Sequence, residues 1–103
     1  MNDTEKLAGL IPFGRENAVS REALAEKMGM GDRAMRKAIE RARAEGLMIC
    51  NEQEENGGYY QSNNVNELLR QYRRDTARAL SVLKRRKPMR DALIAAGIPK
   101  GDL

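Results

Sequence analysis

A glycine-bearing break separates two helical patterns in the stretch AEKMGMGDRAMRKAIE. The first pattern predicts a helix over Arg21–Met28, because Ser20 is a good N-cap and Gly29 suits the left-handed position that follows a helix. The second pattern predicts a helix over residues 32–45, which Gly46 ends. Two helices joined by so short a turn must cross at a steep angle, which is the geometry of a helix-turn-helix.

The second of these helices has two chemically distinct faces. At 100° per residue its apolar face is formed by Met35, Ala38, Ile39 and Ala42. Arg33, Lys37 and Glu40 fall opposite, with Arg36 and Arg41 at their sides. A helix fits the DNA major groove, and Arg and Lys side chains contact guanine edges and phosphates. The predicted groove and phosphate contacts are therefore Arg33, Arg36, Lys37 and Arg41. The alternative is an ordinary helical hairpin whose charges are solvated.

A β-hairpin is predicted directly after the two helices. LMIC and YYQS read as strands, and NEQEENGG reads as the polar loop between them, with a Gly-Gly pair that permits a tight turn. A short helix near the N-terminus and a short strand at Ala18-Val19 precede this region. The loop carries Glu52, Glu54 and Glu55, which phosphates would repel. Either this hairpin stays off the DNA backbone or it contacts another protein.

A long helix is predicted after the hairpin, with Asn63 or Asn64 as its N-cap. Its apolar residues recur at helical spacing from Val65 to Leu83, and Pro88 is expected to break or kink it before a further short helix over residues 89–96. The apolar stripe either folds back on its own domain or pairs with the same helix of a second chain. A homodimer would place two recognition helices for two half-sites.

The charge is unevenly distributed between the two halves of the chain. Residues 65–103 carry ten Lys and Arg against four Asp and Glu, whereas residues 1–64 carry nine against eleven. The division predicts a helix-turn-helix domain over residues 1–64 and a basic helical element over residues 65–103, which can serve dimerisation. Basic residues near DNA add salt-sensitive affinity that does not depend on sequence. The predicted second-rank backbone contacts are Arg73, Arg74, Lys84, Arg85 and Arg86.

Several function classes are disfavoured by composition. Cys50 is the only cysteine and there is no histidine, which argues against a structural zinc site and against His-based catalysis. No phosphate-binding loop follows a predicted strand, and no apolar run approaches the length of a membrane span. The N-terminus does not have the pattern of a signal peptide. We therefore expect a cytoplasmic protein without catalytic activity, metal, cofactor or membrane partner.

Residues 11–87 resemble a winged-helix group found in small proteins of bacterial phages and prophages. The residues that carry the resemblance are IPFGRENAVSREALAEKMGMGDRAMRKAIERARAEGLMI, then GGYY, then LRQYRRDTARALSVLKRRK. Leu24-Ala25, Gly29 and Ile39 match the usual small and aliphatic positions of winged helix-turn-helix domains. The resemblance implies double-stranded DNA binding, by transcriptional regulators or by phage replication and recombination accessory proteins. The chain departs from the pattern at Gly31, where a Ser or Thr cap is more usual, and in its acidic wing.

The fold expected from these observations is mainly α with a small β-hairpin. It is a winged helix with a three-helix helix-turn-helix core, a wing and a long C-terminal helix. The expected function is double-stranded DNA binding in the bacterial cytoplasm, as a homodimer associated with the nucleoid when bound. The alternative is a protein–protein interaction adaptor that uses the acidic wing and the long helix and does not bind DNA.

Overall fold

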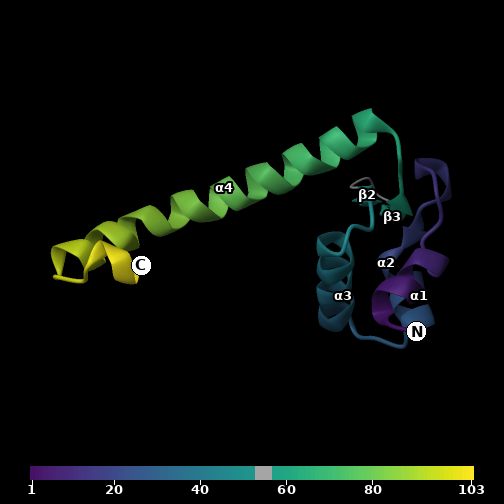
Figure 1. Ribbon diagram of the computed structural model, residues 1–103, viewed down its shortest axis with the longest axis horizontal. Coiled ribbons are helices and arrows are strands. Elements are labelled where there is room, and N and C mark those ends of the chain that lie inside the picture. The colour runs from purple at the N-terminus through teal and green to yellow at the C-terminus, as the bar shows by residue number, and fades with distance from the viewer. Residues whose placement is uncertain (53–56) are drawn as a thin grey trace. The chain divides into compact units, whose positions relative to one another are not determined.

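The computed structural model describes residues 1–52 and 57–103, and these residues divide into two compact units. The first unit is Met1–Gln71 and the second is Tyr72–Leu103. The described residues form four α-helices and a three-stranded antiparallel sheet (Figure 1). The expected fold class, mainly α with a small sheet, is confirmed at this level. Among the described helices, none has both the length and the apolar character that a membrane crossing requires.

Three helices form the first part of the first unit. Helix α1 is Asp3–Leu10, α2 is Arg21–Met28 and α3 is Asp32–Ala44. Asn2 caps α1 by accepting a hydrogen bond from the backbone N–H of Glu5 at 2.8 Å. Ser20 caps α2 in the same way through Ala23 at 3.1 Å. The bounds of α2 and α3 agree with the sequence predictions to within one residue, because capping residues and glycines mark these ends locally.

The sheet has its strands in the order β1–β3–β2, and both pairings are antiparallel. Strand β1 is Val19–Ser20, β2 is Ile49–Asn51 and β3 is Gly58–Gln61. The two predicted hairpin strands and the short strand predicted at Ala18-Val19 are thus confirmed, with bounds that differ by one or two residues. A turn of 3-10 helix, η1 (Arg15–Asn17), leads into β1. The expected loop residues Glu54 and Glu55 lie outside the described part of the chain.

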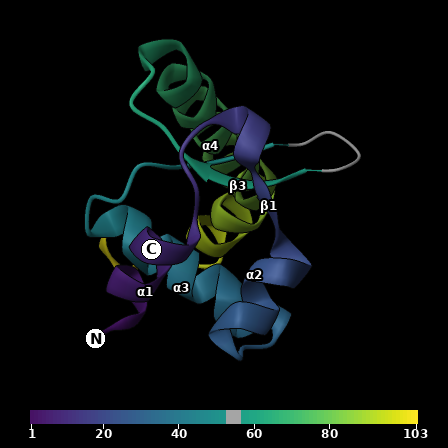
Figure 2. The ribbon, with the colours of Figure 1, turned by 90° about the vertical axis from the view of Figure 1, so that its right-hand side faces the viewer.

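The hydrophobic core lies between the three helices and the sheet. Figure 2 shows α1, α2 and α3 gathered on one side of the sheet. The buried residues of the core are Leu7, Ile11, Leu24, Met35, Ala38, Ile39, Ala42 and Ile49. All four predicted apolar positions of α3 belong to this set, so the predicted inner face of α3 is confirmed. Burial of this aliphatic surface is the main source of stability for the unit.

The buried side chain of Gln61 joins α1 to the sheet. Its Nε2 donates hydrogen bonds to the carbonyl oxygens of Ala8 at 3.0 Å and Ile11 at 2.7 Å. The Gln61 backbone N–H donates to the carbonyl of Pro12 at 2.7 Å, and the N–H of Gly14 donates to the Gln61 carbonyl at 3.1 Å. These bonds satisfy carbonyls at the end of α1 that have no partner within the helix. The path of the chain from α1 to η1 is therefore held against β3.

Helix α4, Val65–Ala95, begins on the sheet through a polar network. Asn64 Oδ1 accepts hydrogen bonds from the backbone N–H groups of Asn66 and Glu67, so Asn64 is the cap that the sequence offered. Ser62 Oγ donates to Glu67 Oε1 at 2.6 Å and accepts from the Asn64 N–H at 3.0 Å. Buried Gln71 accepts a hydrogen bond from the Asn51 N–H in β2 at 3.0 Å. The first two turns of α4 therefore belong to the first unit.

Helix α4 continues through Pro88, so the separate short helix expected over residues 89–96 is wrong. Figure 1 shows one unbroken ribbon, and the helix spans 31 residues. Proline cannot donate a hydrogen bond to the carbonyl four residues earlier, which is that of Lys84. Both Lys84 and Pro88 are exposed, so water can solvate the carbonyl that lacks its helical donor. A kink at Pro88 stays a prediction. A short 3-10 turn, η2 (Lys100–Asp102), follows the helix.

Tyr60 gives the first unit a pH-dependent stability that can be measured. Burial raises the pKa of the Tyr60 phenol, and electrostatic interactions with Cys50, Glu67 and Glu52 raise it further, while Arg15 lowers it. The folded state therefore holds this proton more tightly than the unfolded chain, in which the tyrosine pKa is 10.0. Stability that is present below about pH 10 is then lost as the pH rises through the folded pKa.

We expect the free energy of unfolding, measured by urea denaturation, to fall as the pH is raised above about 10. The Tyr60→Phe variant has no proton to lose at this position, so its stability should fall less steeply. Tyr72→Phe, at an exposed tyrosine, is the matched control and should follow the wild type. Equal slopes for all three proteins would contradict the assignment to Tyr60.

Candidate functional site

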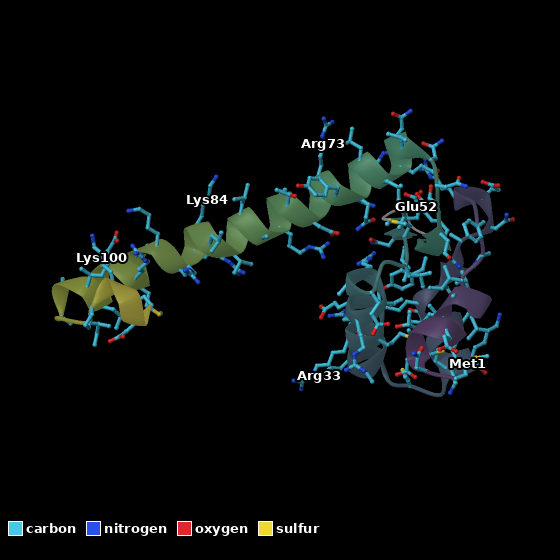
Figure 3. The ribbon with its side chains drawn as sticks, viewed as in Figure 1. Met1, Arg33, Glu52, Arg73, Lys84 and Lys100 are labelled. Atoms are coloured by element: carbon cyan, nitrogen blue, oxygen red, sulfur yellow. The ribbon has the colours of Figure 1, made fainter. Side chains whose placement is uncertain are left out.

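Helix α3 exposes a basic face on the side opposite the core. Arg33, Arg36, Lys37 and Arg41 are all exposed, and the structure brings these four predicted residues together on one helix. Figure 3 shows Arg33 projecting from the start of α3, away from α1 and α2. Because Met35 and Ala42 on the other side are completely buried, α3 cannot rotate to hide its cations without opening the core.

The turn between α2 and α3 fixes the direction of α3. Gly29 has φ +65° and ψ 34°, a left-handed conformation that favours glycine. The N–H of Met30 donates to the carbonyl of Ala25 at 3.0 Å, and the N–H of Gly29 donates to that of Glu26 at 3.1 Å. These two hydrogen bonds form the Schellman motif, in which the N–H of the residue after the glycine bonds back to a carbonyl in the last turn of the helix. Met30 accordingly packs against the core, and α3 starts at a defined angle.

An ion-pair cluster joins the first turns of α2 and α3. Asp32 Oδ1 lies 3.0 Å from Arg21 Nε, and Asp32 Oδ2 lies 3.3 Å from Arg36 Nε. The spacing of Asp32 and Arg36 places them on neighbouring turns, which the sequence alone could have indicated. Arg21 comes from another helix, so no local pattern identifies it. Neither Arg21 nor Asp32 is among the site residues that the sequence predicts.

Arg43 of α3 has a structural role, because it bonds to strand β2. Its Nε donates to the carbonyl of Ile49 at 3.1 Å, and its Nη2 donates to Asn51 Oδ1 at 3.4 Å. These contacts link the end of α3 to β2. Arg33, Arg36, Lys37 and Arg41 of α3 are therefore exposed, whereas Arg43 in the last turn supports the sheet.

The acidic loop is described only where it leaves β2. Glu52 forms an ion pair with Arg15 of η1, which the sequence does not predict. A polar cavity of about 270 Å³ opens beside Glu52 and reaches the start of α2. Its lining consists of Arg21, Glu22, Asn51, Glu52, Gly57, Gly58 and Tyr59. The negative charge of Glu52 is thus compensated within the first unit.

The predicted second-rank contacts lie on α4 in the second unit. Arg73, Lys84, Arg85 and Arg86 are exposed, and Arg74 is half-buried. Figure 3 shows Arg73 and Lys84 extending outward from their helix. The second unit carries nine Lys and Arg against three Asp and Glu, so its surface is strongly basic.

Cys50 lies in the interior of the first unit. It is completely buried, and its Sγ lies 3.9 Å from the carbonyl oxygen of Glu67, to which it donates a weak hydrogen bond. Residues 1–52 and 57–103 contain no group of three or more His, Cys, Asp or Glu side chains that could hold a metal ion. The basic face of α3 is the candidate site considered below.

Comparison of the chain with protein-family models, with curated proteins and with solved structures found no match.

Proposed function

We propose that the chain is a winged-helix protein that binds double-stranded DNA, with α3 as its recognition helix and the β2–β3 hairpin as its wing. The observation that carries this proposal is the segregation of α3. Its four apolar positions are enclosed in the core, while Arg33, Arg36, Lys37 and Arg41 are exposed together on the other side. An exposed basic face on a helix held rigidly from behind is what docking into a major groove requires.

The position of the cations along α3 supports the same function. Arg33, Arg36 and Lys37 lie in the first two turns, and the residues near the beginning of a recognition helix are those that reach base edges. Arg36 and Arg21 contact Asp32 through Nε. Each guanidinium also carries Nη N–H donors of the kind that match a phosphate or a guanine edge.

The charge of the described part of the wing is compatible with a nearby phosphate backbone. Glu52 alone would repel phosphates, but its ion pair with Arg15 brings the pair close to neutrality. The function would be regulatory or accessory, in transcription or in phage DNA transactions, and without catalysis. Arg73, Arg74, Lys84, Arg85 and Arg86 remain second-rank candidates for backbone contacts.

The proposal is tested by fluorescence anisotropy of a labelled mixed-sequence DNA duplex over a salt series. We expect the wild type to bind with an affinity that falls steeply as salt increases. The Arg33→Ala/Lys37→Ala variant should bind about tenfold more weakly or worse, since each groove or phosphate contact contributes about 1 kcal/mol or more. Its salt slope should fall by about one for each phosphate that the variant no longer neutralises.

The matched control is Lys6→Ala/Lys100→Ala, which removes the same charge at two exposed lysines outside α3. This control should stay close to the wild type. Equal weakening of both double variants would mean that only net charge matters and would remove α3 from the site. No duplex binding at low salt would contradict the proposal and would leave the adaptor function as the one to test.

A further inference from the structure

An acidic side chain lies at the beginning of the proposed recognition helix, where a carboxylate alone would repel phosphates. Asp32 is the first residue of α3, and its side chain is 55% exposed. Its Oδ1 lies 3.0 Å from Nε of Arg21 in α2, and its Oδ2 lies 3.3 Å from Nε of Arg36, one turn later in α3. One carboxylate is thus shared by two arginines that come from two helices.

The Asp32 cluster, which consists of Arg21, Asp32 and Arg36, retains positive charge and an excess of hydrogen-bond donors. Two arginines and one aspartate leave a net charge of +1. A carboxylate accepts about four hydrogen bonds, whereas two guanidinium groups carry about ten N–H donors, so about six donors remain for another acceptor. The Arg21 and Arg36 side chains are 43% and 59% exposed, so an acceptor can approach them. The chemistry of the cluster therefore suits an anion with several oxygen atoms.

The Asp32 cluster has more effect on the arrangement of its arginines than on the stability of the fold. Ion pairs between exposed side chains stabilise a protein little, because water solvates both partners and screens their attraction. Without the carboxylate, however, the two guanidinium groups would repel each other, and each long side chain would sample several rotamers. Asp32 therefore keeps Arg21 and Arg36 adjacent before any ligand arrives.

We propose that Asp32 is a positioning residue, which holds Arg21 and Arg36 as a pair that binds one phosphate of the DNA backbone. The inference rests on the proposed function and adds Arg21 to the contact surface. A guanine edge takes a single guanidinium, whereas a phosphate has enough acceptor oxygens for two. Arg21 begins α2, and the first helix of a helix-turn-helix crosses the DNA backbone, so this arginine comes near phosphates. Ordering the pair in advance reduces the entropy lost on binding.

The direction of the change in DNA affinity distinguishes positioning from simple repulsion. Asp32→Asn removes one negative charge from α3, and Glu40→Gln, the matched control, removes one from another exposed position of the same helix. Repulsion alone would make both variants bind duplex DNA more tightly than the wild type. We expect Glu40→Gln to bind at least as tightly as the wild type. Asp32→Asn should bind about threefold more weakly or worse, because two side chains must then be ordered on binding. Fluorescence anisotropy of a labelled mixed-sequence duplex measures both.

A protein without the two arginines tests whether Asp32 acts through them. In the Arg21→Gln/Arg36→Gln variant, Asp32 has neither guanidinium to position, and its charge only repels DNA. Adding Asp32→Asn to this variant should therefore tighten binding, which is the reverse of its effect in the wild type. Arg21→Gln alone should weaken binding and lower the salt slope by about one, as the loss of one phosphate contact requires.

Nuclear magnetic resonance relaxation of the arginine Nε–H groups measures positioning in the absence of DNA. The Nε–H groups of Arg21 and Arg36 should be more ordered than that of Arg33 and should lose this order in Asp32→Asn, while circular dichroism remains that of the wild type. Equal mobility of the three groups in the wild type would overturn the inference.

The DNA measurements separate failure of this inference from failure of the proposed function. Tighter binding by Asp32→Asn, or a weakening that persists when Arg21 and Arg36 are absent, would overturn the positioning role and leave duplex binding by α3 intact. No duplex binding by the wild type at low salt would contradict the proposed function itself, and the phosphate would be excluded as the ligand of the Asp32 cluster.

Discussion

Gly58→Ala is expected to destabilise the first unit by about 3 kcal/mol or more, at the upper end of what overpacking costs. Gly58 lies opposite Ser20 where β3 pairs with β1. A Cβ added to Gly58 would lie 2.5 Å from the carbonyl carbon of Val19 and 3.0 Å from the Ser20 nitrogen, and closer still to the Val19 oxygen. These neighbours are backbone atoms, so no side chain can turn aside, and β1 must separate from β3.

Thermal and urea unfolding followed by circular dichroism measure this effect. Gly9→Ala is the matched control, because a Cβ at Gly9 in α1 meets no atom within 4 Å. Alanine favours a helix over glycine, so this control should stabilise the protein by about 0.5–1 kcal/mol. If Gly58→Ala lowers the free energy of unfolding while Gly9→Ala raises it, the contact with β1 is responsible for the loss. A Gly58→Ala protein as stable as the wild type would show that β1 does not approach β3 this closely.

Gln61→Leu should destabilise the protein by about 2–4 kcal/mol, because it leaves two carbonyl groups without their donor. Leucine is similar in size to glutamine but cannot donate to Ala8 or Ile11. The backbone hydrogen bonds of Gln61 to Pro12 and Gly14 are retained, so the change isolates the side chain. Part of the loss should appear at the end of α1, where those two carbonyls lie.

Hydrogen exchange of the α1 amides, together with urea unfolding, distinguishes this effect from a general loss of stability. We expect exchange near Ile11 to accelerate more than exchange in α3. Asn63→Leu removes an exposed side-chain amide two residues later in the chain and should change stability by less than about 0.5 kcal/mol. If Gln61→Leu is equally mild, the buried amide does not hold α1 against the sheet.

The parts of the fold that sequence predicts well are those determined by nearby residues. Helices α2 and α3 have their ends marked by Ser20, Gly29 and Gly46, and the periodicity of α3 identifies its buried face. The cap of α4 at Asn64 is another local signal. The four cations assigned to α3 all lie on its exposed face for the same reason, since one helix determines their relative positions.

The contacts that sequence does not predict join residues distant in the chain. Gln61 and Ala8 are 53 positions apart, and Arg15 and Glu52 are 37 apart, so no short pattern relates them. Arg21 reaches Asp32 only because the α2–α3 turn sets the angle between two helices. The prediction of a helix break at Pro88 is wrong for a different reason. Whether a proline interrupts a helix depends on whether water can solvate the carbonyl that loses its hydrogen-bond donor.

The strand order has a consequence for when the first unit can form during synthesis. Strand β3 is the last of the three in the chain, yet it lies between β1 and β2, which have no pairing with each other. Until residues 58–61 leave the ribosome, β1 and β2 have no partner strand and α1 lacks the amide of Gln61. The three helices are complete by residue 44, so their collapse can precede the sheet. The sheet should then close in a single late step, in which one strand joins both neighbours and secures α1.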